Sequence, residues 1–89
     1  MRLDRYLKIS RLIKRRSVAK EVVEDGNVAI NGKIAKPSSE VKVGDEIEMK
    51  LGQHIVGVKV TNIMEYAGIS EAETMYEVIF QENMGGRRS

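Results

Sequence analysis

The 89-residue chain has no cysteine, no tryptophan, a single proline and a single histidine, and its only aromatic residues are three tyrosines and one phenylalanine. The absence of cysteine excludes a disulfide scaffold, a thiolate zinc site and a cysteine nucleophile. One histidine, His54, cannot form a multi-histidine metal site. No apolar run reaches the ~20 residues of a membrane span, and no signal-peptide core is present. The composition therefore predicts a small cytoplasmic domain without a metal or other cofactor.

Acidic residues are also scarce in the first twenty positions, where Asp4 is the single acid among eight bases and the local charge is +7. The bases are Arg2, Arg5, Lys8, Arg11, Lys14, Arg15, Arg16 and Lys20. The other 69 residues carry 7 bases and 12 acids, a local charge of −5. Clustered lysine and arginine neutralise phosphates and release their counterions, so this basic segment predicts a polyphosphate partner. A solvated helix face, the alternative interpretation, usually interleaves acids with the bases.

Apolar residues at helical spacing predict a first helix over residues 3–9, with Leu3, Tyr6 and Leu7 on its buried side. Asp4 lies in the first turn of this helix, where the helix dipole favours a negative charge. Holding a neighbouring arginine in place is compatible with the same position.

The segment 10–16 contains four of the eight bases and separates the first helix from a second one. Ser17 is the expected N-cap of the second helix, and Gly26 is its expected end because glycine readily adopts positive φ. Free backbone N–H groups and the positive end of the helix dipole would meet four cations at this start. These cations are Lys14, Arg15, Arg16 and Lys20. The combination predicts a phosphate-binding site.

Short alternating segments predict a small sheet after the two helices. Asn31-Gly32 is a type I′ turn signal between strands 28–30 and 33–35. Further strands are expected over 46–51, over about 55–63 with a bulge at Gly57, and around Tyr76, Val78 and Phe80. Residues 66–73 are expected to be irregular or to form at most one helical turn. The fold class is therefore α+β, with two helices packed on a mostly antiparallel sheet.

Several short strings in the first half of the chain form a known pattern. They are Leu3-Asp4-Arg5-Tyr6-Leu7, Ser10-Arg11-Leu12, Arg15-Arg16-Ser17, Val28-Ala29-Ile30-Asn31-Gly32 and Pro37-Ser38. This pattern resembles the alpha-L RNA-binding motif that is shared with the small-subunit ribosomal protein S-four. The resemblance covers residues 1–51 and implies the same α+β fold. Residues 52–82 would be a C-terminal strand extension of the same single domain, and residues 83–89 a disordered tail.

Stand-alone proteins of this size in the superfamily include the heat-shock protein fifteen family and the RqcP (YabO) family of ribosome-associated quality-control proteins. The run from Leu3 to Val22 is most similar to the latter. That resemblance implies binding to the large ribosomal subunit through 23S rRNA and peptidyl-tRNA. It also implies support of C-terminal alanine tailing beside a tRNA-recruiting factor. The heat-shock-type alternative implies recycling of large subunits that carry nascent chains. In either case we expect a monomer that is not an enzyme.

The resemblance implies an RNA-binding face on the bases of the two helices, with the hairpin turn at its edge. Its expected residues are Arg2, Arg5, Arg11, Lys14, Arg15, Arg16, Lys20, Asn31 and Lys33. Tyr6 is expected in the core, and Tyr66, Tyr76 and Phe80 are expected in the acidic body, so few aromatics are available for base stacking. The sequence therefore favours recognition of structured RNA by shape and phosphate position.

Other functions fit the sequence less well. A DNA-binding helix-turn-helix protein would need base-reading side chains on the second helix, where Glu21 and Glu24 stand instead. An enzyme would need a nucleophile constellation, a glycine-rich phosphate loop or a metal cluster, and the sequence contains none. A membrane-surface role would need a large apolar face on the first helix. The acidic body is read as a solvated sheet surface that could also keep the sheet turned away from rRNA.

Overall fold

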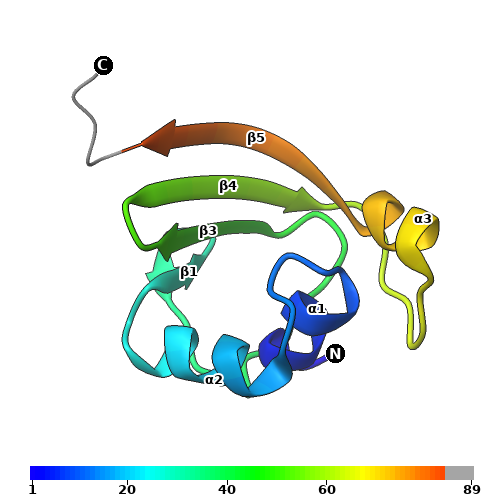
Figure 1. Ribbon diagram of the computed structural model, residues 1–89, viewed down its shortest axis with the longest axis horizontal. Coiled ribbons are helices and arrows are strands. Elements are labelled where there is room, and N and C mark those ends of the chain that lie inside the picture. The colour runs from blue at the N-terminus through cyan, green and yellow to red at the C-terminus, as the bar shows by residue number, and fades with distance from the viewer. Residues whose placement is uncertain (84–89) are drawn as a thin grey trace.

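Two short helices pack under one face of a curved antiparallel sheet in the computed structural model, which describes residues 1–83 (Figure 1). The elements are α1 (Leu3–Ile9), α2 (Arg16–Glu24), β1 (Val28–Ile30), β2 (Lys33–Ile34), β3 (Glu46–Leu51), β4 (His54–Val60), α3 (Ile69–Ala72), the 3₁₀ turn η1 (Glu73–Met75) and β5 (Tyr76–Asn83). The predicted α+β class is confirmed, and so are the bounds of the first helix. Within the described residues, no helix is long and apolar enough to cross a membrane.

The sheet has the strand order β2-β1-β3-β4-β5, and every neighbouring pair is antiparallel. Alternation along β3 buries Ile47 and Met49 against the helices and exposes Glu46 and Glu48 on the opposite face. This period-2 pattern is typical of a sheet that is covered on one side only. Both N-terminal helices lie on the apolar side, and in Figure 1 no described helix covers the other side.

Tyr6 connects the first helix to the far end of the chain. Its ring is fully buried, and its hydroxyl donates a hydrogen bond of 2.6 Å to the carbonyl oxygen of Met75 in η1. Burial, with a smaller contribution from Tyr76, raises the pKa of the Tyr6 hydroxyl above its usual range. The expected core position of Tyr6 is confirmed, and the contact fixes the β4–β5 connection to α1.

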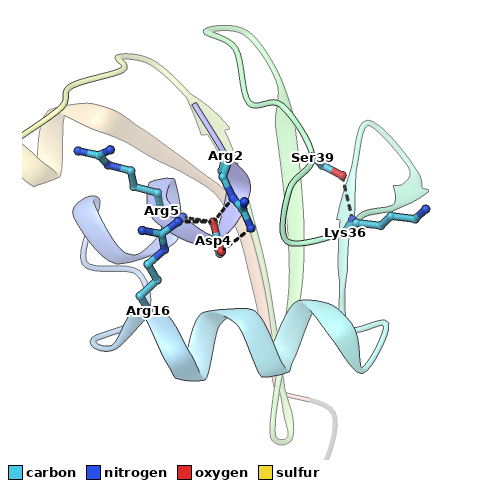
Figure 2. Close-up of polar contacts among 6 residues, drawn as sticks. All are labelled: Arg2, Asp4, Arg5, Arg16, Lys36 and Ser39. Atoms are coloured by element: carbon cyan, nitrogen blue, oxygen red, sulfur yellow. Dashed lines mark hydrogen bonds and ion pairs between the residues drawn. The ribbon is translucent and has the colours of Figure 1, made fainter.

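The start of α1 is held by the loop before β3. The N–H groups of Leu3 and Asp4 donate to the carbonyl oxygens of Ser39 and Pro37, at 2.8 and 3.1 Å. Helix starts usually rely on a side-chain cap for these groups, but here backbone carbonyls satisfy them. The loop itself is closed by a 2.9 Å hydrogen bond from the Lys36 N–H to the Ser39 hydroxyl (Figure 2).

The second helix begins earlier than the sequence predicts. Arg15, in an extended conformation, occupies the N-cap position, and Ser17 lies inside the first turn without making a capping hydrogen bond. The prediction of Ser17 as N-cap is wrong because the chain already enters the helix at Arg16 without a side-chain cap. At the other end, Gly26 has the positive φ of 82° expected of a residue that terminates a helix.

The Asn31-Gly32 turn between β1 and β2 is confirmed, since the two residues have φ values of 51° and 85°. The Asn31 side chain also binds the segment before β3. Its amide nitrogen donates to the Asp45 carboxylate at 3.1 Å, and its oxygen accepts from the Glu46 N–H at 2.9 Å. Asn31 therefore holds the hairpin against β3.

The second half of the sheet differs from the prediction in two ways. The strand expected over 55–63 ends at Val60, because the following N–H groups of Thr61 and Asn62 donate to the Met75 carbonyl. A bulge does occur beside Gly57, between Gly57 and Val58, but its extra residue is Ile79 in β5 and not a residue of β4.

The bulge also interrupts the face alternation along β5. Val78 pairs with Val58, whereas Phe80 pairs with Gly57, so Val78 and Phe80 lie on opposite faces of the sheet. Asn83 is the last residue of β5, and the rest of the predicted disordered tail lies outside the described residues.

The Gly57–Phe80 pair yields a test of this register. A Cβ added at Gly57 would overlap the Phe80 ring, so we expect Gly57→Ala to lower the free energy of unfolding by about 1–3 kcal/mol. In a Phe80→Ala background the same substitution should cost much less. Urea unfolding of the four proteins of this double-mutant cycle measures the difference, and equal costs in both backgrounds would refute the pairing.

Candidate nucleic-acid interface

Exposed cations collect around α1, the turn that follows it and the start of α2. Arg2, Arg5 and Lys8 recur every three residues and therefore share one side of α1. The exposed or half-exposed cations of the turn and of α2 are Arg11, Lys14, Arg15, Arg16 and Lys20. We call these eight residues the basic face. It contains all the bases of the first twenty residues that are expected in the RNA-binding face, and it adds Lys8.

A buried carboxylate organises the centre of the basic face. The Asp4 side chain is 3% exposed and accepts from Arg2 at 3.2 and 3.3 Å, from the Arg5 N–H at 2.7 Å and from Arg16 at 3.5 Å. Figure 2 shows the guanidinium groups of Arg2 and Arg16 converging on it from two elements, while the Arg5 side chain extends away. Asp4 thus orients two arginines whose side chains remain about half exposed.

Burial alone would raise the pKa of the Asp4 carboxyl. The hydrogen bond from Arg2, the charge of Arg16 and the Arg5 N–H oppose this effect, and together they lower the pKa below its usual range. Asp4 is therefore ionised at neutral pH, and both arginines keep their fixed counter-ion.

Arg11 has the unusual backbone of the turn. Its φ is 64°, a conformation that residues other than glycine seldom adopt. The preceding Ser10 is buried, and its hydroxyl donates to the Leu7 carbonyl at 3.3 Å. Arg11 thus reverses the chain direction immediately after α1 and presents an exposed guanidinium where a glycine would be the common choice.

The start of α2 is open toward the basic face. No side chain caps it, and the first helical hydrogen bond runs from the Ala19 N–H to the Arg15 carbonyl at 3.0 Å. The preceding N–H groups of this nine-residue helix are left for solvent or a ligand. The predicted combination of open N–H groups and neighbouring cations is present here, and phosphate binding at this start stays a prediction.

Two shallow hollows show which cations come together. One is lined by Arg5, Lys8 and Arg16, and the other by Lys8, Arg11 and Lys14. Lys8 belongs to both, so it joins the two halves of the basic face. Its spacing of three from Arg5 and from Arg11 was the sequence signal for this position.

The prediction that Tyr66 lies in the acidic body is wrong. Tyr66 lines the same hollow as Arg5, Lys8 and Arg16, and the adjacent Ile69 lines the other hollow. Both residues belong to the β4–β5 connection. This connection is held against α1 by the Tyr6–Met75 hydrogen bond and by an ion pair. In that ion pair the Arg5 guanidinium lies 3.0 Å from the Glu65 carboxylate. No local pattern in the sequence reveals this long-range contact.

The two hairpin residues of the predicted site lie elsewhere. Asn31 and Lys33 follow the C-terminal end of α2, whereas the cations surround its N-terminal end, about 13 Å away along the helix. The Asn31 amide is occupied by Asp45 and Glu46, and Lys33 is exposed on the short strand β2. Neither residue lines the two hollows of the basic face.

Comparison with known proteins places this geometry in context. Residues 1–47 match the S4 domain. The chain is 51% identical over 82 residues to the RQC P-site tRNA stabilizing factor of Halalkalibacterium halodurans, covering 92% of this chain and 93% of the relative. It is 48% identical over 85 residues to the factor of that name from Bacillus subtilis, covering 96% and 99%. Among solved structures, the trimeric heat shock protein 15 of Vibrio cholerae superposes with a TM-score of 0.81 at 35% identity, covering 88% of this chain and 80% of that one.

The Asp4 cluster makes stability depend on pH in one direction. Because its folded pKa is lowered, Asp4 stabilises the fold above about pH 4, its usual pKa range, and this contribution is lost as the pH falls through the lowered pKa. We expect Asp4→Asn to lower the free energy of unfolding by about 1–2 kcal/mol at pH 7. The difference from wild type should shrink below about pH 4 in urea titrations. A difference that is constant from pH 7 to pH 3 would contradict the ionic cluster.

The backbone at Arg11 allows folding and binding to be separated. Arg11→Gly relieves the positive φ, so stability should stay equal or rise by up to about 1 kcal/mol. Affinity for structured RNA should nevertheless fall, and the slope of log affinity against log salt should become shallower by about 1. Arg11→Lys, which keeps both the charge and the strain, is the matched control. A glycine variant that binds RNA as wild type does would remove Arg11 from the interface.

Proposed function

The chain belongs to the S4 domain family, and from this premise we propose that it is a non-catalytic RNA-binding factor of the large ribosomal subunit. In this proposal the basic face contacts 23S rRNA and a peptidyl-tRNA that is retained on the subunit. The observation that carries it is the basic face itself, which has eight exposed or half-exposed cations and a buried carboxylate that holds two of them in place. A surface of this kind suits phosphates that have a fixed spacing.

Each part of the basic face has a physical role in the proposal. Arg2 and Arg16 offer planar guanidinium groups in orientations that Asp4 fixes, which suits bidentate contact with phosphate oxygens. The open start of α2 adds backbone N–H groups to the same site. Lys14 and Lys20 are exposed point charges at its border. Such a face recognises the shape and phosphate positions of folded RNA.

The proposed cellular role follows the two curated relatives described above. Two of them, at 51% and 48% identity over nearly their whole length, bear the name RQC P-site tRNA stabilizing factor. We therefore propose that the chain holds peptidyl-tRNA in the P site of stalled large subunits. There it would support C-terminal alanine tailing beside a tRNA-recruiting factor. Action on ribosomes also implies a cytoplasmic protein.

We further propose that the chain acts as a monomer. All eight cations of the basic face come from one chain, so a second copy is not needed to complete the site. The trimeric state is that of the Vibrio cholerae protein.

A second candidate function has a specific observation in its favour. The structural similarity to heat shock protein 15 of Vibrio cholerae extends over 88% of the chain, which supports recycling of large subunits that carry nascent chains. The lower sequence identity of 35%, against 51% for the P-site factor, makes this the runner-up. Both functions use the same basic face.

Co-sedimentation with purified ribosomal particles tests the proposal. We expect the wild-type protein to migrate with large subunits and to be enriched on those that retain peptidyl-tRNA. Arg16→Ala should weaken this binding about tenfold, or about 1.4 kcal/mol, without unfolding the protein. Lys59→Ala is the matched control, because Lys59 is an equally exposed cation on β4, opposite Glu46 in the sheet. About six phosphate contacts would give a salt slope of about −4 to −5.

Three results would count against the proposal. Recovery of the wild-type protein at the top of the gradient, free of ribosomal particles, would remove the ribosomal function. Equal losses for Arg16→Ala and Lys59→Ala would show that net charge, and not the basic face, controls binding. A nearly flat salt dependence would indicate that the face contacts protein.

A further inference from the structure

The two hollows of the basic face have walls of different chemistry. Arg5, Lys8 and Arg16 line the first hollow on the side of α1 and α2, and Tyr66 lines it from the β4–β5 connection. Ile69 of the same connection faces Lys8, Arg11 and Lys14 across the second hollow. The two hollows are open to solvent and have volumes of about 440 and 430 Å³. Cations thus face exposed apolar side chains across a space that could hold a nucleotide.

Tyr66 has no role in the core. Its side chain is 84% exposed, and Ile69 is 72% exposed. Among residues 1–83, the Tyr66 hydroxyl has no hydrogen-bond partner. Exposed apolar side chains occur singly on many surfaces, but here two of them stand opposite five cations. This arrangement is what a polyanion with flat apolar parts would require.

The β4–β5 connection that carries Tyr66 is anchored both at its base and beside Tyr66 itself. At its base, the Thr61 hydroxyl donates to the Thr74 carbonyl at 2.6 Å, and the Met75 carbonyl accepts the Tyr6 hydroxyl. Beside Tyr66 itself, Arg5 reaches both the Glu65 carboxylate at 3.0 Å and the Glu65 carbonyl at 3.4 Å. The backbone that carries the ring is therefore held in place, so the connection itself needs little ordering when a ligand binds.

We propose that this hollow is a subsite for one unpaired nucleotide, whose base stacks on Tyr66 while its phosphates contact Lys8 and Arg16. The inference rests on the proposed function and deepens it, because phosphate contacts alone do not distinguish paired from unpaired RNA. Aromatic rings stack on any base, since every base has a π-face, and structured RNA offers such bases in bulges and loops. Arg5 acts as a positioning residue through its contacts with Glu65.

An acidic peptide could also meet five cations, and it is the competing occupant. The exposed tyrosine ring favours the nucleotide, because a stacked base uses the flat face of the ring that carboxylates do not need.

The test uses two fluorescein-labelled RNA hairpins that differ by one bulged adenosine. We expect wild-type protein to bind the bulged hairpin more tightly than the fully paired one. Tyr66→Ala should lose about 5- to 150-fold affinity for the bulged hairpin, the range for loss of one base–aromatic stack, and little for the paired one. Tyr66→Phe should restore the affinity. The salt slope should not change, because no phosphate contact is removed.

Two controls separate stacking from structure. Ile34→Ala removes an exposed apolar side chain on β2 that lines neither hollow of the basic face. This variant should bind both hairpins as wild type does. Because the chain contains no tryptophan, Tyr66→Trp introduces a single indole. Its fluorescence should be quenched by the bulged hairpin and not by the paired one.

The outcomes distinguish this inference from the proposed function. If wild type does not discriminate the hairpins, or if Tyr66→Ala binds both normally while Arg16→Ala is impaired, the stacking subsite is refuted and the RNA-binding face stands. If a labelled polyglutamate peptide, and not RNA, depends on Tyr66, the hollow is a protein-binding site and the inference is also refuted. Failure of the wild-type protein to bind either hairpin or large subunits would overturn both.

Discussion

The carboxylate of Asp4 is the contact on which the basic face depends. Eight cations within twenty residues repel one another, and a rigid array of them needs a fixed counter-charge. Asp4 supplies it from a buried position, where the attraction is less screened than at the surface. Because Arg2 precedes α1 and Arg16 begins α2, one side chain also fixes how the two helices meet. The same ion cluster thus contributes to the fold and to the interface.

The rest of the scaffold holds that cluster from distant parts of the chain. Carbonyls of the loop at residues 37–39 accept hydrogen bonds from the first N–H groups of α1. The Met75 carbonyl accepts the hydroxyl of Tyr6, which lies in the same helix. These contacts explain which parts of the fold were predictable from sequence. Helix 3–9 and the Asn31-Gly32 turn follow from local spacing and backbone preference, and both are confirmed. The end of β4 at Val60 depends on hydrogen bonds to Met75, a long-range contact that local patterns do not contain.

The candidate site shows the same division. Charge counting identifies the cations, because lysine and arginine at high density are informative wherever the fold places them. It does not reveal Tyr66, which is 50 residues away from Arg16 in sequence and shares a hollow with it. The family resemblance places Asn31 at the edge of the site, and the structure shows that Asn31 uses both ends of its amide within the fold. Side chains that serve the scaffold cannot be separated from those that serve a ligand until their partners are known.

The acids of the sheet do not cancel the cations of the helices, although the net charge of the chain is only +2. The molecule measures 39 × 26 × 23 Å, several times the Debye length of about 8 Å at physiological ionic strength. Glu46 and Glu48 project from the sheet face opposite the helices, so an RNA against the basic face is largely screened from them. At longer range, before contact, a polyanion attracts the basic face and repels the acidic side of the sheet. The two forces together turn the basic face toward the polyanion. In the proposed function, the local charge of +7, and not the net charge, therefore governs the approach of the basic face to RNA.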